Sequence, residues 1–227
     1  MKIIFALASL CACAATASAQ TGTPRYEIGV QYSSLTINVP APPQQGAGSF
    51  SPFESRTQPG LGARFTLNLS DSFALEAEGN FFPKDEQIVT QTSGGRTLQG
   101  QFGVKAGRRF DKFGIFAKAR PGVVNFSRVV VIDGLTSITL GGQQFFTPNF
   151  ASKHRTYFST DVGAVAEFYP SRRLVTRFDV GDTIVRYGSY TFSPAGLIAP
   201  GVAPPLFNQP SEIKHNLQVS AGVGYRF

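Results

Sequence analysis

The amino-acid sequence predicts an all-β fold, an eight-stranded antiparallel, up-and-down transmembrane β-barrel with short periplasmic turns and four long extracellular loops. Three observations predict it. Apolar and polar residues alternate in eight segments, as in strands whose two faces meet different surroundings. The connections between these segments alternate between short and long. The last segment keeps its apolar face up to the final residue, Phe227, which favours lipid on that side.

The first 19 residues have the pattern of a secretory signal peptide. Lys2 precedes an apolar run over residues 3–15, and Ala17-Ser18-Ala19 forms a small-residue cleavage site. The run is too short for a transmembrane helix, which needs about 20 residues. We therefore expect residues 1–19 to be removed and residues 20–227 to form a single barrel domain.

Cysteines and charges exclude two function classes. Cys11 and Cys13 both lie in the leader, so the mature chain has no thiol for redox chemistry. An alternative makes residues 10–13 a lipoprotein box with Cys13 lipidated, although Cys11 is a poor residue for that position. The chain has 21 Lys and Arg against 14 Asp and Glu, but they are spread singly rather than in a run, so we expect no nucleic-acid partner.

The eight segments follow one another along the mature chain. Each places apolar residues on one parity and glycine, polar or charged residues on the other, as expected for strands between lipid and a lumen. They cover residues 26–32, 61–69, 73–81, 98–110, 115–123, 158–168, 174–184 and 217–227. Their apolar faces begin with Tyr26, Leu61, Phe73, Leu98, Ile115, Phe158, Leu174 and Leu217.

The connection lengths indicate how the strands are oriented. Tight turns at residues 70–72, 111–112 and 170–173 follow the second, fourth and sixth segments. Long links follow the other segments at residues 33–60, 82–97, 127–155 and 187–214. Outer-membrane barrels have this layout, which predicts both termini in the periplasm. An even number of strands also closes the sheet, so that no edge is left unpaired in lipid.

Two features of the alternation leave alternatives open. A soluble barrel of lipocalin type has the same period with its apolar face turned inward. The polar parity here is rich in glycine and in charges of both signs, which fits a narrow lumen better than a water-exposed exterior. In the first segment, Leu35, Ile37 and Val39 take the parity opposite to Tyr26. This predicts either a bulge near residues 33–34 or a change of role above the membrane.

Nine charged residues fall on the polar parity: Arg64, Glu76, Glu78, Lys105, Lys118, Arg120, Asp161, Arg177 and Asp179. Strand pairing sets Arg64 opposite Glu78, which is favourable, and Lys105 opposite Lys118, which needs carboxylates such as Glu78 or Asp179 to reach across the lumen. Because such a barrel is just wide enough for side chains, we expect an ionic network that fills the lumen. The alternative is a gate whose salt bridges exchange partners to pass small solutes.

The architecture, the terminal Val223, Tyr225 and Phe227 and the inward charges of residues 177–181 resemble the OmpA-type family of small outer-membrane β-barrels. The resemblance implies the outer membrane of a Gram-negative-type bacterium, with the terminal aromatic pattern recognised by the barrel-assembly machinery. Two departures change these expectations. The family's best-known members continue into a peptidoglycan-binding domain, which we do not expect here. The chain also has no Trp, so an interfacial girdle must use Tyr and Phe.

The function expected is a structural or slight porin-like role in the cell envelope, without catalytic residues, cofactor or metal. The two histidines, His154 and His215, lie on different segments and form no metal-binding spacing. The alternative is a surface-binding or adhesin-type protein that acts through its extracellular loops. The apolar stretch 195–207 would then bind a partner, or otherwise fold over the barrel mouth or pack on surface lipid. We expect a monomer in contact with outer-membrane lipid.

Overall fold

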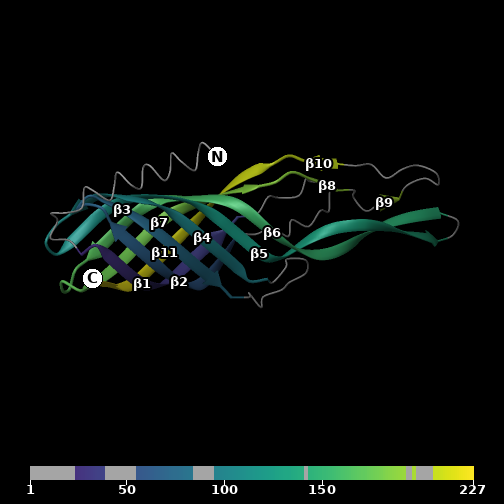
Figure 1. Cartoon of the computed structure of the whole chain (residues 1–227). Helices are drawn as coiled ribbons and strands as arrows, with labels where there is room; N and C mark the ends of the chain where they lie inside the picture. The colour runs from purple at the N-terminus through teal and green to yellow at the C-terminus, as the bar shows by residue number, and fades with distance from the viewer. Residues whose placement is uncertain (1–23, 39–54, 84–94, 141–142, 193–195, 198–206) are drawn as a thin grey trace, which may run out of the picture.

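The computed structural model describes residues 24–38, 55–83, 95–140, 143–192, 196–197 and 207–227. Eight long strands form a barrel (Figure 1): β1 (Tyr26–Ile37), β2 (Arg56–Asn68), β3 (Phe73–Phe82), β4 (Thr97–Arg109), β5 (Phe113–Leu140), β6 (Gln143–Phe168), β7 (Leu174–Tyr187) and β11 (Glu212–Arg226). Three short strands lie beyond it: β8 (Tyr190–Phe192), β9 (Gly196–Leu197) and β10 (Phe207–Gln209). The predicted signal peptide lies outside the described residues.

The eight long strands are antiparallel and close into a barrel. Each pairs with its neighbours in the chain, and β1 pairs with β11, so that Val30 lies opposite Val223. The predicted fold class is therefore confirmed. Turns after β2, β4 and β6 lie at the same end of the barrel as Pro24 and Phe227 (Figure 1), which we call the turn end. The opposite end, from which β5 and β6 extend, is the hairpin end.

The side chains alternate between an apolar outer surface and a polar interior. Leu61 and Val30 point outward and are 67% and 63% exposed, whereas Arg120 and Arg177 point inward and are fully buried. A water-soluble barrel has the reverse arrangement, so the lipocalin-type alternative does not apply. Within the described part of the chain, no helix is long and apolar enough to cross a membrane.

The strands extend further than the outward pattern predicts. The register of β1 with β2 is unbroken from Tyr26 to Ile37, so there is no bulge near residues 33–34. Instead, Leu35 turns into the lumen and is 2% exposed, as the predicted change of role requires. The lipid-facing pattern ends at this level, but the strand continues because its inner face becomes apolar.

The prediction of a loop over residues 127–155 was wrong. This segment forms a β-hairpin in which β5 and β6 remain paired up to Leu140 and Gln143 (Figure 1). The register shifts between Phe126 and Val129 and again between Ile132 and Gly134, and these irregularities interrupt the period of two. The segment is nevertheless rich in β-branched residues, which favour strands. The other predicted loops lie largely outside the described residues, including 39–54, 84–94 and 198–206.

Candidate functional site

The lumen of the barrel is filled in three layers of different chemistry. Charged side chains occupy the half nearest the turn end, and we call them the ionic layer. Amide and hydroxyl side chains lie above them and form the amide layer. Apolar side chains at the hairpin end form the apolar layer. This order follows from the height of each residue above its turn, counted along strands with an almost continuous register.

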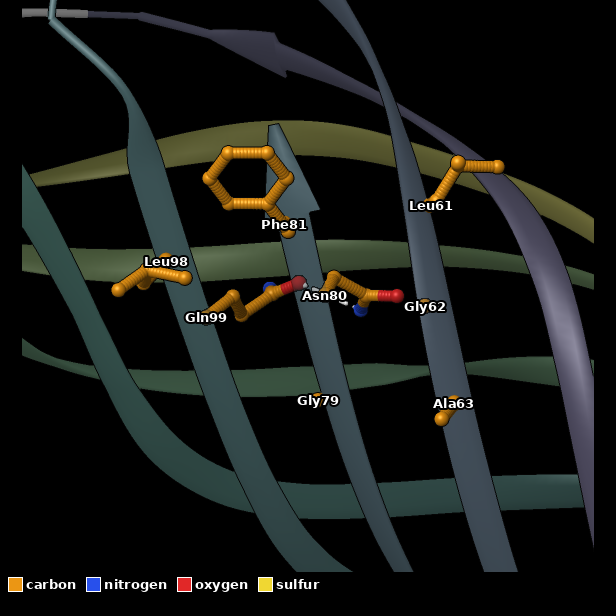
Figure 2. Close-up of a pocket in the computed structure, with 8 residues that line it drawn as sticks. All are labelled: Leu61, Gly62, Ala63, Gly79, Asn80, Phe81, Leu98 and Gln99. Carbon is orange, nitrogen blue, oxygen red and sulfur yellow. Dashed lines mark hydrogen bonds between the residues drawn. The ribbon is translucent and has the colours of Figure 1, made fainter. Parts of the chain in front are cut away.

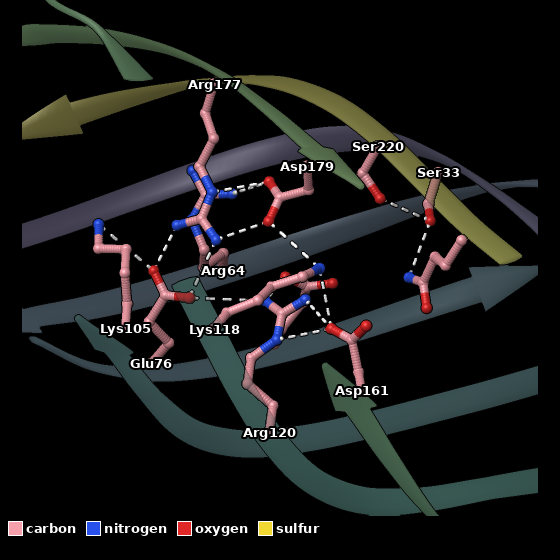
Figure 3. Close-up of polar contacts among 12 residues, drawn as sticks. Ser33, Arg64, Glu76, Lys105, Lys118, Arg120, Asp161, Arg177, Asp179 and Ser220 are labelled. Atoms are coloured by element: carbon pink, nitrogen blue, oxygen red, sulfur yellow. Dashed lines mark hydrogen bonds and ion pairs between the residues drawn. The ribbon is translucent and has the colours of Figure 1, made fainter. Parts of the chain in front are cut away.

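The structure places all nine charged residues predicted for the lumen in the ionic layer, at exposures of 5% or less. Arg177 lies at the centre of one cluster (Figure 3): it binds Glu76 through both terminal nitrogens, and its Nε donates to Asp179 Oδ2 over 2.7 Å. Arg120 lies at the centre of a second cluster. It binds Glu78, and its Nε donates to Asp161 Oδ2 over 3.1 Å. Bidentate contacts of this kind fix guanidinium orientation as well as charge.

Strand register and ion-pair partners differ in the ionic layer. Arg64 lies opposite Glu78, as the pairing of β2 with β3 predicts. Its side chain, however, donates to Gln31 over 3.0 Å and lies 3.9 Å from Asp179, while Glu78 binds Arg120. Long side chains reach across the narrow lumen, so the nearest strand neighbour is not the strongest partner.

The two facing lysines are each neutralised from across the lumen. Lys105 lies opposite Lys118 in the register of β4 with β5. Lys118 Nζ lies 2.8 Å from Asp161 and 3.4 Å from Asp179. Lys105 Nζ binds Glu167 and lies 3.5 Å from Glu76. These two carboxylates take the place of the predicted partner Glu78.

Four further charges belong to the ionic layer and were absent from the predicted network: Glu27, Arg109, Glu167 and Arg226. They lie nearest the turn end. Arg226 Nε lies 3.1 Å from Glu27 Oε1, and Arg109 Nη2 lies 3.6 Å from both Glu27 and Glu167. All four occur on the polar parity of their strands, so the same alternation could have identified them.

The amide layer is a chain of hydrogen bonds that crosses from strand to strand. Gln31 Nε2 donates to Asn80 Oδ1 over 3.0 Å, and Asn80 Nδ2 donates to Gln99 Oε1 over 2.9 Å. Gln99 in turn donates to Gln218 over 2.9 Å, and Gln218 to Ser33 over 3.1 Å. The chain begins at the ionic layer, because Arg64 donates to Gln31.

Glycine makes room for this layer and also shapes the outer surface. A Cβ on Gly62 would lie 1.9 Å from Asn80 Oδ1, so only glycine accommodates the inward amide at that position. On the lipid side, Ala63 and Gly79 leave a hollow of about 370 Å³ beside Leu61, Phe81 and Leu98 (Figure 2).

The apolar layer fills the lumen at the hairpin end. Leu35, Ile37 and Phe82 form one buried cluster, with Phe126 packed against it. A second contains Val124, Val185 and Tyr187, and the rings of Tyr157 and Tyr187 lie 4.8 Å apart. The predicted network contained no such layer. In the sequence, only the reversed parity of Leu35 and Ile37 indicated that such an apolar layer exists.

Neither histidine belongs to the lumen layers. His215 Nδ1 lies 2.5 Å from Asp182 Oδ2 on the outer surface, and both side chains are exposed. In the part of the chain that the structure describes, no group of three or more His, Cys, Asp or Glu residues is placed to hold a metal ion.

A closed eight-stranded barrel with an apolar outer belt and a polar lumen defines the class of small outer-membrane barrels. The family described as "Outer membrane protein beta-barrel domain" matches residues 5–227, and the chain belongs to it. The protein is therefore one of the bacterial outer membrane.

Solved structures share the fold at low sequence identity. The chain is similar to Neisserial surface protein A (TM-score 0.50, 10% identity, covering 89% of this chain and 97% of that one). It is also similar to Ail, the attachment invasion locus protein of Yersinia pestis (TM-score 0.47, 11% identity, covering 90% of this chain and 99% of that one). A third similar structure is the N-terminal β-barrel domain of Pseudomonas aeruginosa OprF (TM-score 0.45, 8% identity, covering 90% of this chain and 100% of that one). No curated protein matches the sequence.

Proposed function

We propose that the barrel is a membrane anchor and that the β5–β6 hairpin is a surface-binding element. The observation that carries the proposal is the continuation of β5 from Val129 to Leu140, paired with β6, beyond the barrel wall (Figure 1). Twelve residues at about 3.3 Å each correspond to roughly 40 Å of strand. The proposal includes an orientation in which the turn end and both termini face the periplasm and the hairpin projects outward.

The hairpin offers a strand edge to a partner. The edge of β6 is partly covered, because Phe145 and Phe146 pair with β9. Among the described residues, β5 beyond Ser127 is paired in strand register with β6 alone. An uncovered strand edge presents backbone N–H and C=O groups that an extended segment of another protein can pair with. The exposed Ile138 would then provide a side-chain contact beside the backbone pairing.

A structural or slight porin-like role has less support. The ionic layer is held by contacts such as Arg177 with Glu76 and Arg120 with Asp161, and an exchange of these partners would still leave the apolar layer in place. A conducting state therefore requires movement of Phe82 and Tyr187 in addition to a rearrangement of salt bridges. The anchor proposal requires neither movement.

The test replaces residues 129–153 by a short turn and compares cells that display the two proteins. Attachment to a panel of immobilised extracellular-matrix and serum proteins should fall to background for the truncated protein, while its surface level and heat-modifiable gel mobility stay unchanged. Planar-bilayer recording separates the rival function. Steady conductance of the full-length protein, with attachment unaffected by truncation, would overturn the anchor proposal in favour of the porin-like one.

A further inference from the structure

A pocket of about 750 Å³ opens at the turn end, below the ionic layer. It is lined by Pro24, Asp71, Arg109, Phe110, Asp111, Tyr169, Ser171, Arg172 and Arg226. These residues come from the segment before β1, from the three turns and from the last residues of β4 and β11, so the pocket is the mouth of the barrel. Its size is in the range of sites for small ligands. We call it the turn-end pocket.

Arg109 provides a buried cationic group with an unused donor. Its side chain is 8% exposed, its Nε donates to Tyr169 Oη over 2.9 Å, and its Nη2 donates to Asn68 Oδ1 over 3.2 Å. Its Nη1 is buried and has no hydrogen-bond partner among the described residues. A buried donor without an acceptor is unfavourable, so a small shift of the Arg109 side chain that brings this nitrogen to the pocket would let it bind an incoming oxygen.

Tyr169 holds two guanidinium groups at the pocket. The Arg226 guanidinium lies 4.5 Å and that of Arg109 5.5 Å from the centroid of its ring, both within cation–π range. The Tyr169 hydroxyl donates to Glu167 Oε2 over 2.8 Å. Burial raises the pKa of this hydroxyl, and the neighbouring Glu167 carboxylate raises it further, so it remains a proton donor to Glu167.

The charges around the pocket are arranged by depth. Arg109 and Arg226 lie at its buried floor, whereas Arg172, Asp71 and Asp111 are exposed at its rim. The two aspartates oppose an anion from the rim, where solvent screens them. At the floor, Glu27 and Glu167 lie within 3.6 Å of these arginines and balance their charge. An anion there would therefore be held by directional N–H groups rather than by a net positive charge.

We propose that the turn-end pocket binds an oxyanion, a phosphate or carboxylate group, with Arg109 Nη1 and the Arg226 guanidinium as donors at the floor and Arg172 at the rim. Guanidinium groups suit such ligands because their N–H groups match the geometry of the oxygens. The binding itself rests on this geometry alone. The anion's source, a soluble periplasmic molecule or a phospholipid headgroup, follows from the proposed orientation.

The test uses inorganic phosphate as the probe and the full-length barrel refolded in a detergent without net charge. Calorimetric titration at constant ionic strength should show saturable binding of one phosphate per barrel. Arg109→Gln should weaken it by roughly tenfold or more, the effect of losing one charge-assisted hydrogen bond. Arg172→Gln should weaken it by a smaller factor and keeps the test valid if the buried variant does not fold.

Two matched controls come from the neighbouring residues. Arg108 is exposed, and its guanidinium lies over the Phe110 ring at 5.5 Å, while Arg173 is exposed beside Arg172. Arg108→Gln and Arg173→Gln remove the same charge without changing any side chain that lines the pocket, so phosphate affinity should stay unchanged. Absence of saturable binding, or equal losses in pocket and control variants, would overturn the proposal.

A second arm identifies the source of the anion. The same titration is repeated in nanodiscs of phosphatidylcholine and of phosphatidylglycerol. If phosphate binds more weakly in the phosphatidylglycerol discs than in the phosphatidylcholine discs, and Arg172→Gln removes this difference, the pocket is assigned to a lipid headgroup. Equal binding in both lipids assigns it to a soluble anion. Both results require the pocket to bind phosphate.

Discussion

The half of the lumen near the turn end is filled mainly by paired charges, with Phe116, Val165 and Val175 buried among them, whereas the half near the hairpin end is filled mainly by aliphatic and aromatic side chains. Arg177 and Phe82 represent the two halves, and both are completely buried. The first is held by directional contacts with two carboxylates, the second by close packing with Leu35 and Ile37. Burial alone therefore does not indicate what holds a side chain in this lumen. The loss of stability on substitution should distinguish the two kinds of contact.

The largest loss of stability is expected for Arg177→Ala. The variant leaves Glu76 and Asp179 without their main partner, and breaking a buried pair costs about 3–5 kcal/mol, with the upper end expected for two carboxylates. Urea unfolding of the refolded barrel in phospholipid vesicles measures this free energy. Arg173→Ala in the exposed turn is the control and should change stability by about 0.5 kcal/mol or less. A loss below about 1 kcal/mol for Arg177→Ala would show that the ionic layer is well hydrated.

Phe82→Ala tests the other half and should cost about 3–4 kcal/mol, because it removes a fully buried ring and leaves a cavity. Phe82→Ala combined with Arg177→Ala should open both halves of the lumen, so bilayer recording of the double variant should detect more small-ion conductance than for the parent protein. Phe81→Ala, at the adjacent lipid-facing position, is the control and should leave conductance unchanged. If the double variant conducts no better than Arg177→Ala alone, the apolar layer does not contribute to blocking the lumen.

Glu78→Ala should have a smaller effect, about 1–3 kcal/mol in the same unfolding measurement. Arg120 loses one carboxylate but keeps Asp161, so its charge is not left alone. We expect no conductance in this variant, since the apolar layer remains intact. Conductance in this variant, with the apolar layer unchanged, would instead favour a gate formed by salt bridges. Asp111→Ala in an exposed turn serves as the control for stability.

Deletion of Phe227 should have the smallest effect on the stability of the folded barrel. Its ring is exposed and lies 5.7 Å from that of Tyr26, outside both halves of the lumen. Assembly in cells should nevertheless be impaired, because we predict that Val223, Tyr225 and Phe227 are the signal for barrel insertion. The folded fraction in outer-membrane preparations measures this. Normal assembly of the shortened chain would remove the basis for that prediction.

The parts of the fold that depend on a period of two could be predicted from the sequence, and the rest could not. The strand faces and the inward position of Arg64 or Asp179 follow from parity alone. The extension of β5 beyond Phe126 was missed because two register shifts interrupt the parity. The pairing of Arg120 with Glu78 depends on reach across the lumen, which strand register does not contain. The apolar layer was visible only as the reversed parity of Leu35.

The amide layer separates two surroundings that would be unfavourable in direct contact. A charge placed directly against Phe82 would lose its hydration with nothing to replace it. The chain from Gln31 through Asn80 and Gln99 puts neutral dipoles between them, and these can orient toward the charges below without carrying charge upward. Near Phe82, the change from ionic to apolar contacts therefore passes through one layer of hydrogen-bonded neutral groups.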